Sequence, residues 1–321
     1  MKLALLGCGA IARRAHLPAF AAISGTEVVA FASRTRASAE AARDQWGSGA
    51  VFDDWQSALD ADGIDAAVIC TPNVHHCEMT LAAVERGLHV LVEKPMAPTV
   101  DEADRMIAAA EAAGVVLMPA QNVRFAPPFA AASRSVAAGD IGRVVAFRGA
   151  FGHGGPEGWA PEATWFFERD LAGGGALLDL GVHMVDVIHA VVGERVVEVA
   201  AMVDEDMSAP ALERLAQAVM RTESGAVGTL QASWSIRPGP DHQLSVFGTE
   251  GTLHLDSRTP LTLTRIDGTT ERVELEEADN PFAAFARAVG GERPAVSAQD
   301  GRDAVAVVCA AYEAARTGTV V

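Results

Sequence analysis

The sequence has little of what would direct a chain to a membrane, a nucleic acid or an oxidising compartment. No run of about 18 consecutive apolar residues occurs in its 321 residues, so no transmembrane helix is predicted. Basic residues are scarce, with 25 Lys and Arg against 42 Asp and Glu, whereas nucleic-acid binding needs clustered positive charge. The four cysteines lack paired spacing. We expect a cytoplasmic protein with reduced thiols, no membrane contact and no nucleic-acid partner.

Apolar residues make up half of the chain, which is enough for two domains with separate cores. The first third alternates short apolar strands with helical stretches, and the rest follows a different pattern. The prediction is an α/β protein with one domain at residues 1–121 and a second at residues 122–321.

A glycine-rich turn, residues 7–12, joins the first predicted strand (2–6) to a helix that extends to about residue 22. It reads G-C-G-A-I-A. In such a turn the first glycine permits the tight bend and the second lets the backbone approach a pyrophosphate, while the small last residue allows close helix packing. The helix start offers N–H groups to the phosphates. We predict a dinucleotide site that includes Gly7, Gly9, Ala10 and Ile11.

The residues after the second predicted strand (27–32) bear on which dinucleotide is bound. An NAD site usually has an acidic residue about 20 positions past the glycines, but this sequence has Ser33-Arg34-Thr35-Arg36. A hydroxyl and a guanidinium suit the 2′-phosphate of NADP, which a carboxylate would repel. We therefore favour NADP over NAD, with Ser33 and Arg34 as contacts. The alternative is that both arginines are solvated residues at the start of the next helix.

Further predicted strands at 50–52, 66–70, 88–92 and 115–118 would complete a doubly wound sheet of strand order 3-2-1-4-5-6, in which ligands bind outside the carboxyl ends of the strands. Cofactor contacts are therefore expected in the segments after those ends: Thr71, Pro72, Asn73, His76, Glu93, Lys94 and Asn122. For His76, packing at a helix start is the alternative. His75, His76 and Cys77 cannot all face one ion on a regular helix, so no metal site is predicted.

Lys94 follows the apolar strand at 88–92 and precedes Pro95. Lysine is rarely buried without a partner, and its pKa falls readily when it is buried. Proline fixes its own φ and restricts the preceding residue, so Lys94 should be rigidly placed. We predict that Lys94 faces both the cofactor and a substrate hydroxyl.

The remaining chain predicts a helix over about 127–138, a strand at 143–149, and a series of short alternating strands between 196 and 264. Turn residues separate these strands, which indicates a mostly antiparallel sheet with helices on one face. The loop 151–169 is expected to cover the substrate through Trp165, although Trp165-Phe166-Phe167 could equally be a buried anchor. An apolar outer face of the sheet would form a dimer surface.

A second candidate site lies in the segment 173–186, which reads GGGALLDLGVHMVD. Asp179, His183 and Asp186 share one face of a helix that is otherwise apolar, so this polar stripe needs partners. Lys94 is a candidate partner, and the three glycines would let the backbone approach a ligand. The alternatives are an Asp–His pair that only fixes helix packing and a metal site with two carboxylates and one histidine.

These motifs together resemble the Gfo/Idh/MocA family (glucose–fructose oxidoreductase, inositol dehydrogenase, rhizopine catabolism) over essentially the whole chain. The motifs are the turn at 7–12, Glu93-Lys94-Pro95, Asn122-x-Arg124-Phe125 and the segment 173–186. The resemblance implies a Rossmann domain, an α/β domain with a large open sheet, and homodimers or homotetramers formed through that sheet. It also implies that Lys94, Asp179 and His183 match the family's catalytic residues. Ala12 in place of the third glycine and the missing acidic residue at 33–34 depart from the family pattern.

Family members with this triad oxidise a secondary alcohol of a sugar, polyol or cyclitol, or reduce the ketone. His183 would act as general acid or base, Lys94 would stabilise the charge on the substrate oxygen, and Asp179 would orient His183 or a hydroxyl. The expected substrate contacts are Lys94, Arg124, Trp165, Asp179 and His183. Two alternatives are a glycoside-cleaving relative with no net redox change and a non-catalytic dinucleotide sensor.

Overall fold

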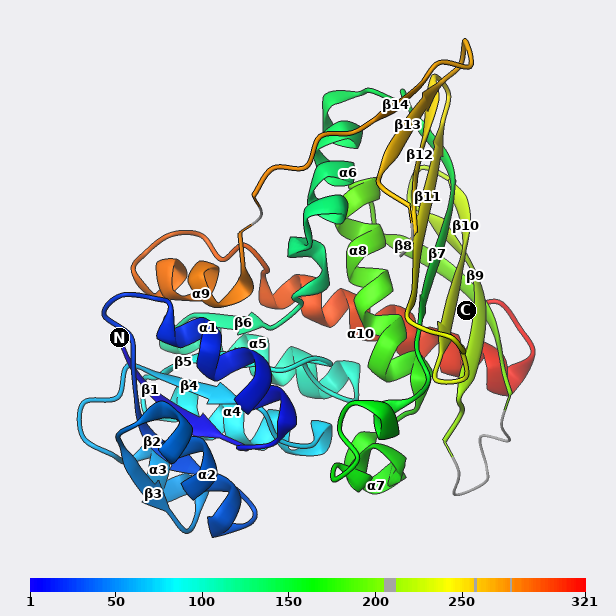
Figure 1. Cartoon of the computed structure of the whole chain (residues 1–321). Helices are drawn as coiled ribbons and strands as arrows, with labels where there is room; N and C mark the ends of the chain where they lie inside the picture. Colours follow the sequence, from blue (N-terminus) through cyan, green and yellow to red (C-terminus); the bar gives the residue numbers. More distant parts are fainter. Residues whose placement is uncertain (205–211, 257–258, 278) are drawn as a thin grey trace. The chain divides into compact units, whose positions relative to one another are not determined.

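The computed structural model describes residues 1–204, 212–256, 259–277 and 279–321. The chain divides into two compact units (Figure 1). The first comprises Met1–Gln121, Asp170–Ala172 and Asp279–Arg302, and the second comprises Asn122–Arg169, Gly173–Ala278 and Asp303–Val321. The sequence places one boundary between residues 121 and 122, and the first unit also takes in the two later segments.

Six parallel strands form the sheet of the first unit, in the order β3-β2-β1-β4-β5-β6. The strands are β1 (Lys2–Leu6), β2 (Glu27–Ala32), β3 (Ala50–Phe52), β4 (Ala66–Ile69), β5 (His89–Val92) and β6 (Leu117–Pro119). The central strand β4 is buried along its whole length, because helices cover both faces of such a sheet. The predicted α/β class and strand order are confirmed.

The helical segments of the first unit differ in how they begin. They are η1 (Ala12–His16), α1 (Leu17–Ala21), α2 (Arg36–Trp46), α3 (Trp55–Leu59), η2 (Asn73–His75), α4 (His76–Glu85), α5 (Val100–Ala113) and α9 (Pro281–Val289). A side-chain oxygen caps the starts of α2, α3, α5 and α9, from Thr35, Asp54, Thr99 and Asn280. Among the described residues no side chain caps the starts of η1, α1, η2 and α4.

The second unit is built on an eight-stranded sheet of order β14-β13-β12-β11-β7-β10-β9-β8. The strands are β7 (Val144–Gly152), β8 (Val196–Val203), β9 (Leu215–Thr222), β10 (Val227–Ser233), β11 (Asp241–Gly248), β12 (Gly251–Leu255), β13 (Thr262–Arg265) and β14 (Thr270–Arg272). Neighbours pair antiparallel except β7 and β10, which pair in parallel. This confirms the predicted mostly antiparallel sheet.

Two helices, α6 (Pro127–Ala138) and α8 (Val182–Val192), lie side by side on one face of this sheet (Figure 1). The shorter helical segments after residue 121 are η3 (Val123–Phe125), η4 (Pro156–Gly158), η5 (Thr164–Phe167), α7 (Arg169–Ala172) and η6 (Leu177–Gly181). The last helix is α10 (Ala298–Thr317). The segment Arg169–Val192 is long and apolar enough to cross a membrane, but 94% of its most apolar window is buried inside the protein. It is a core helix, and it carries Asp179, His183 and Asp186.

Candidate active site

The glycine-rich turn after β1 has the geometry of a phosphate-binding loop. Gly7 has a φ of +89°, and a Cβ there would lie 2.5 Å from the carbonyl oxygen of Cys70, so only glycine fits. At Gly9 a Cβ would meet no atom of the described residues within 4 Å, which leaves room for close approach to the backbone. The helix that continues into η1 begins at Ala10, and a pyrophosphate would supply acceptors for the N–H groups of its first turn. The segment from Gly7 to Ile11 therefore fits a dinucleotide.

Ser33 and Arg34 follow β2 beside this turn. The backbone N–H of Cys8 donates to Ser33 Oγ at 3.3 Å, which ties Ser33 to the loop. Arg34 is exposed, whereas Arg36 forms ion pairs with Glu40 at 3.0 Å and Asp53 at 2.6 Å. Because Arg36 already neutralises two carboxylates, Arg34 is the stronger candidate for an anionic ligand.

His76 holds together the segments that follow β4 and β5. Its ring is fully buried, with Nδ1 2.9 Å from the Pro95 carbonyl oxygen and Nε2 3.0 Å from that of Thr71. Burial lowers the pKa of His76, although the two hydrogen bonds act in the opposite direction. Asn73 is also buried, and its side-chain amide donates to the Ala172 carbonyl at 2.8 Å. His76 thus connects two loops of the predicted cofactor site by bonding the backbone of Thr71 and Pro95. Pro72, another predicted contact, is partly buried.

Lys94 is fixed by the residue before it. The Glu93 carboxylate accepts a hydrogen bond from the backbone N–H of Lys94 at 3.0 Å and lies 2.6 Å from Nε2 of the buried His16. Burial raises the pKa of Glu93, but the hydrogen bond from His16 and the charges of His16 and Lys94 outweigh it, so the net shift is downward. The rigid placement expected of Lys94 is thus reinforced by Glu93. Sequence reasoning missed His16, whose only signal is a histidine in an apolar stretch after the glycine turn.

The thiols beside the turn are poor nucleophiles. Burial raises the pKa of Cys8 to about 12, despite the opposing charge of Arg13, and burial also raises the pKa of Cys70 well above its ordinary value. Within the described ranges, no group of three or more His, Cys, Asp or Glu side chains is arranged to hold a metal ion.

Asp179 and His183 occupy the segment of the second unit that runs from η6 into α8. Both are buried, at 5% and 7% exposure. The indole N–H of Trp234, directly after β10, donates to Asp179 Oδ2 at 2.9 Å. The His183 ring lies 5.4 Å from the ring of Phe151 on β7. Asp179 falls in the π-helical segment η6, an irregularity that is frequent at functional sites.

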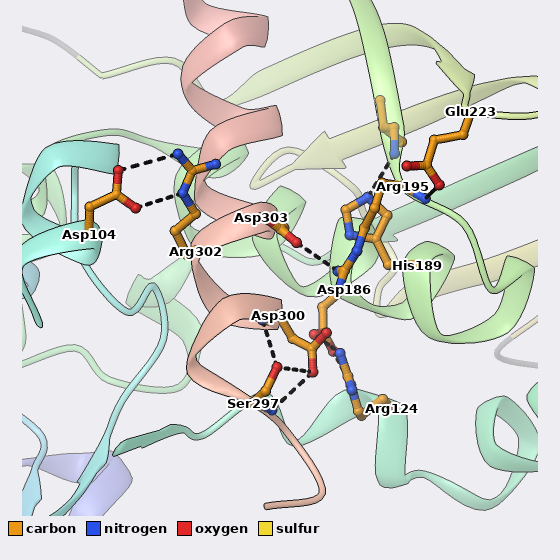
Figure 2. Close-up of polar contacts among 11 residues, drawn as sticks. Asp104, Arg124, Asp186, His189, Arg195, Glu223, Ser297, Asp300, Arg302 and Asp303 are labelled. Carbon is orange, nitrogen blue, oxygen red and sulfur yellow. Dashed lines mark hydrogen bonds and ion pairs between the residues drawn. The ribbon is translucent and has the colours of Figure 1, made fainter. Parts of the chain in front are cut away.

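Asp186 has a different partner. Arg124 donates from Nε to Asp186 Oδ2 at 2.8 Å and also pairs through Nη2 with Oδ1, and Figure 2 shows the two groups facing each other. Bidentate pairs of this kind are strong and geometrically specific. The guanidinium of Arg124, a predicted substrate contact, is therefore paired with Asp186. Asn122, a predicted cofactor contact, is exposed and lies at the start of the η3 turn that carries Arg124.

Trp165 is linked to Asp179 through a chain of aromatic rings. It stacks on Phe166 at 3.9 Å, and Phe166 makes an edge contact with Trp234 at 6.5 Å. The loop 151–169 is thus anchored on the residue that holds Asp179. Trp234 was missed by sequence reasoning, although a buried tryptophan N–H usually has an acceptor, which is a signal that could have found it.

The structure brings the predicted residues together in two groups, one in each unit. The turn at 7–11, Ser33, residues 71–76 and Glu93-Lys94 lie at the carboxyl edge of the parallel sheet. Asp179, His183 and Trp165 belong to the second unit. The pairing of Lys94 with Asp179 and His183 stays a prediction.

Comparison with known proteins gives a family match in each half of the chain. The model "Oxidoreductase family, NAD-binding Rossmann fold" matches residues 1–121, and "GFO/IDH/MocA C-terminal domain" matches residues 129–254. A D-apiose dehydrogenase of Paraburkholderia graminis is 30% identical, with 99% of this chain and 88% of that protein covered. A D-xylose 1-dehydrogenase (NADP(+)) of Haloferax volcanii is 31% identical, with 100% and 99% covered.

Among solved structures, the aldose-aldose oxidoreductase from Caulobacter crescentus, complexed with glycerol, matches with a TM-score of 0.86 at 28% identity, and 100% of this chain and 99% of that chain are covered. Family models therefore account for both halves of the chain, and full-length relatives for its whole length. The chain belongs to the Gfo/Idh/MocA oxidoreductase family, and its first 121 residues are the NAD-binding Rossmann domain.

Proposed function

We propose that the protein is an NADP-dependent dehydrogenase or reductase that acts on a secondary alcohol or ketone of a sugar, polyol or cyclitol. NAD is the second candidate cofactor. The observation that carries the proposal is the buried pair of Asp179 and His183 on one helical segment, with Asp179 held by Trp234 at 2.9 Å. The two relatives named above, both sugar dehydrogenases by name, support a sugar substrate.

Each residue has a chemical role in this proposal. When bound, the nicotinamide supplies the hydride acceptor or donor. His183 takes the proton of the substrate hydroxyl during oxidation, or returns it during reduction, because an imidazole can both accept and donate a proton. Lys94 donates a hydrogen bond to the substrate oxygen and stabilises its negative charge. Asp179, oriented by Trp234, orients His183 or a neighbouring substrate hydroxyl.

A screen of sugars, inositols and keto-sugars against NADP and NAD, followed by nicotinamide absorbance, tests the proposal. Net formation or consumption of reduced cofactor with at least one compound is the expected result. Cleavage of a glycoside without net redox change would favour the glycosidase-like alternative. Cofactor binding without any turnover would favour the sensor.

Replacing Arg34 with alanine is expected to weaken NADP binding about tenfold or more, because a charge-assisted contact to the 2′-phosphate contributes about 1.5–3 kcal/mol. NAD, which lacks that phosphate, should change by less than about twofold. Fluorescence titration of each cofactor measures both. Arg36→Ala is the matched control, since Arg36 is paired with Glu40 and Asp53. Equal losses for NADP and NAD would reject the proposed phosphate contact.

The unfolding temperature should fall as the pH is lowered through about 6.5, partly because of His76. Burial keeps the pKa of His76 below its ordinary value in the folded protein, so the unfolded chain binds more protons and gains stability as the pH falls. Scanning calorimetry between neutral and mildly acidic pH measures the slope. His76→Gln should reduce that slope, and an unchanged slope would show that His76 does not contribute.

We also propose a cytoplasmic homodimer or homotetramer that assembles through the outer face of the eight-stranded sheet. Several apolar side chains on its strands are exposed: Val145, Val197, Met202, Val219 and Val227. The cysteines are present as thiols, as a reducing compartment allows. Light scattering that returns the mass of a single chain would contradict the assembly.

A further inference from the structure

The helical segment that carries Asp179 and His183 begins with four backbone N–H groups, at residues 175–178. A helix start usually leaves these groups without partners inside the helix. Here two residues distant in sequence, Glu213 and Tyr312, accept from all four. Glu213 accepts from Gly175 through Oε2 (3.1 Å), from Ala176 through its backbone oxygen (3.0 Å) and from Leu177 through Oε1 (2.9 Å). Tyr312 Oη accepts from Gly175 and Leu178, both at 3.2 Å.

The two residues, hereafter the Glu213–Tyr312 clamp, are also bonded to each other. Tyr312 Oη donates to Glu213 Oε1 at 2.7 Å, and Glu213 is only 3% exposed. Burial raises the pKa of Glu213, while hydrogen bonds from Tyr312, Leu177 and Gly175 oppose the shift. The clamp is therefore a closed hydrogen-bonded group of the second unit, in which Glu213 is buried and Tyr312 is partly buried.

The glycines before this helix are explained by the clamp. A Cβ at Gly174 would lie 2.5 Å from Tyr312 Oη, and a Cβ at Gly175 would lie 2.1 Å from the Glu213 carbonyl oxygen. Larger residues would push both clamp residues away. From the sequence, the glycines were expected to let the backbone approach a ligand, but Gly174 and Gly175 instead admit protein groups. This helix start is thus closed by the protein.

The clamp acts on the catalytic pair through a short path. The backbone N–H of Asp179 bonds the Gly175 carbonyl oxygen at 2.9 Å, and both clamp residues hold the N–H of Gly175. The π-helical segment η6 begins at Leu177, whose N–H is bound by Glu213. We infer that Glu213 and Tyr312 are positioning residues that set where this segment begins and hence how Asp179 and His183 are oriented. The inference rests on the proposed function.

Tyr312→Phe tests the inference with the loss of a single oxygen. We expect kcat to fall about ten- to a hundredfold, because a displacement of about 1 Å in a catalytic group can cost about a hundredfold. NADP affinity should stay within about twofold, since the predicted cofactor residues, with the exception of Asn122, belong to the other unit. Hydrogen exchange at the amides of 175–178 should become faster. The assay uses whichever of D-xylose, D-glucose and myo-inositol the wild-type protein turns over fastest. Glu213→Gln should show the same loss of kcat and the same faster exchange at 175–178.

Ser133→Ala is the matched control, because Ser133 Oγ donates to the Ala190 carbonyl at 2.7 Å near the far end of α8. It should lower the unfolding temperature without lowering kcat, which separates positioning from general helix stability. Normal kcat in Tyr312→Phe, or a parallel loss in Ser133→Ala, would overturn the inference. If the wild-type protein turns over no compound in the full screen of sugars, inositols and keto-sugars, the proposed function fails. Hydrogen exchange at 175–178 and the NMR signals of the His183 ring would still test the clamp. Faster exchange and shifted ring signals in Tyr312→Phe would support its role in orienting the segment, and unchanged values would contradict it.

Discussion

Replacing His183 with alanine is expected to lower kcat about 10²- to 10⁴-fold, the range that a positioned acid or base contributes. The side chain is buried against Phe151 on the face of the segment that also presents Asp179. NADP should bind with wild-type affinity, because the predicted cofactor residues, with the exception of Asn122, belong to the first unit. Steady-state kinetics and a fluorescence titration measure the two quantities.

His189→Gln is the matched control for this experiment. His189 lies on the same helix and is equally buried, but its Nε2 accepts a hydrogen bond from the Val196 backbone at 3.2 Å, which is a structural contact. This variant should lose thermal stability and keep kcat within about twofold. A His183→Ala enzyme with near-normal turnover would remove the histidine from the mechanism.

Replacing Lys94 with alanine is expected to lower kcat about 10²- to 10³-fold, comparable to the loss of one donor to a developing oxyanion. The Glu93 carboxylate bonds both the Lys94 backbone N–H and His16, which fixes the backbone at position 94. A shift of this backbone to bring another donor to the substrate oxygen would break both hydrogen bonds. Steady-state kinetics measures the loss, with cofactor binding followed in parallel. Lys94→Arg should recover only part of the rate, since a guanidinium has a different shape and reach.

The chain contains only two lysines, Lys2 and Lys94, which gives a simple control. Lys2 is exposed at the start of β1, and its backbone N–H bonds Asp65. Lys2→Ala should therefore leave kcat unchanged. If Lys94→Ala retained normal turnover with cofactor bound, the proposed role of the lysine would be wrong.

Local patterns in the sequence were sufficient for the parallel sheet. Apolar runs such as 66–70 and 88–92 predicted β4 and β5 within one residue, and the glycine turn at 7–12 fixed the first βα unit. Strand β14 was missed because its three residues are polar and exposed, so it has no alternating pattern. The π-helical starts at Ala12 and Leu177 were missed because five residues are too few to distinguish a π from an α period.

The partners of the predicted site residues were harder to find, because they are distant in sequence. Trp234 contacts Asp179 across 55 positions and His16 contacts Glu93 across 77, and these contacts depend on sheet register and helix packing. Arg124 and Asp186 were both identified from motifs, but nothing in their spacing indicated that they pair with each other. Local motifs in the sequence therefore indicate candidate site residues, but they do not indicate the distant residues that hold them.

The clamp residue Tyr312 is the only tyrosine in the chain. Burial and the neighbouring charge of Glu213 raise its pKa well above the ordinary value. Its phenol should therefore stay protonated in alkaline solution until the helix start comes apart. Phenolate absorbance is then an optical signal from one hydrogen-bonded corner of the protein, with no other tyrosine to obscure it.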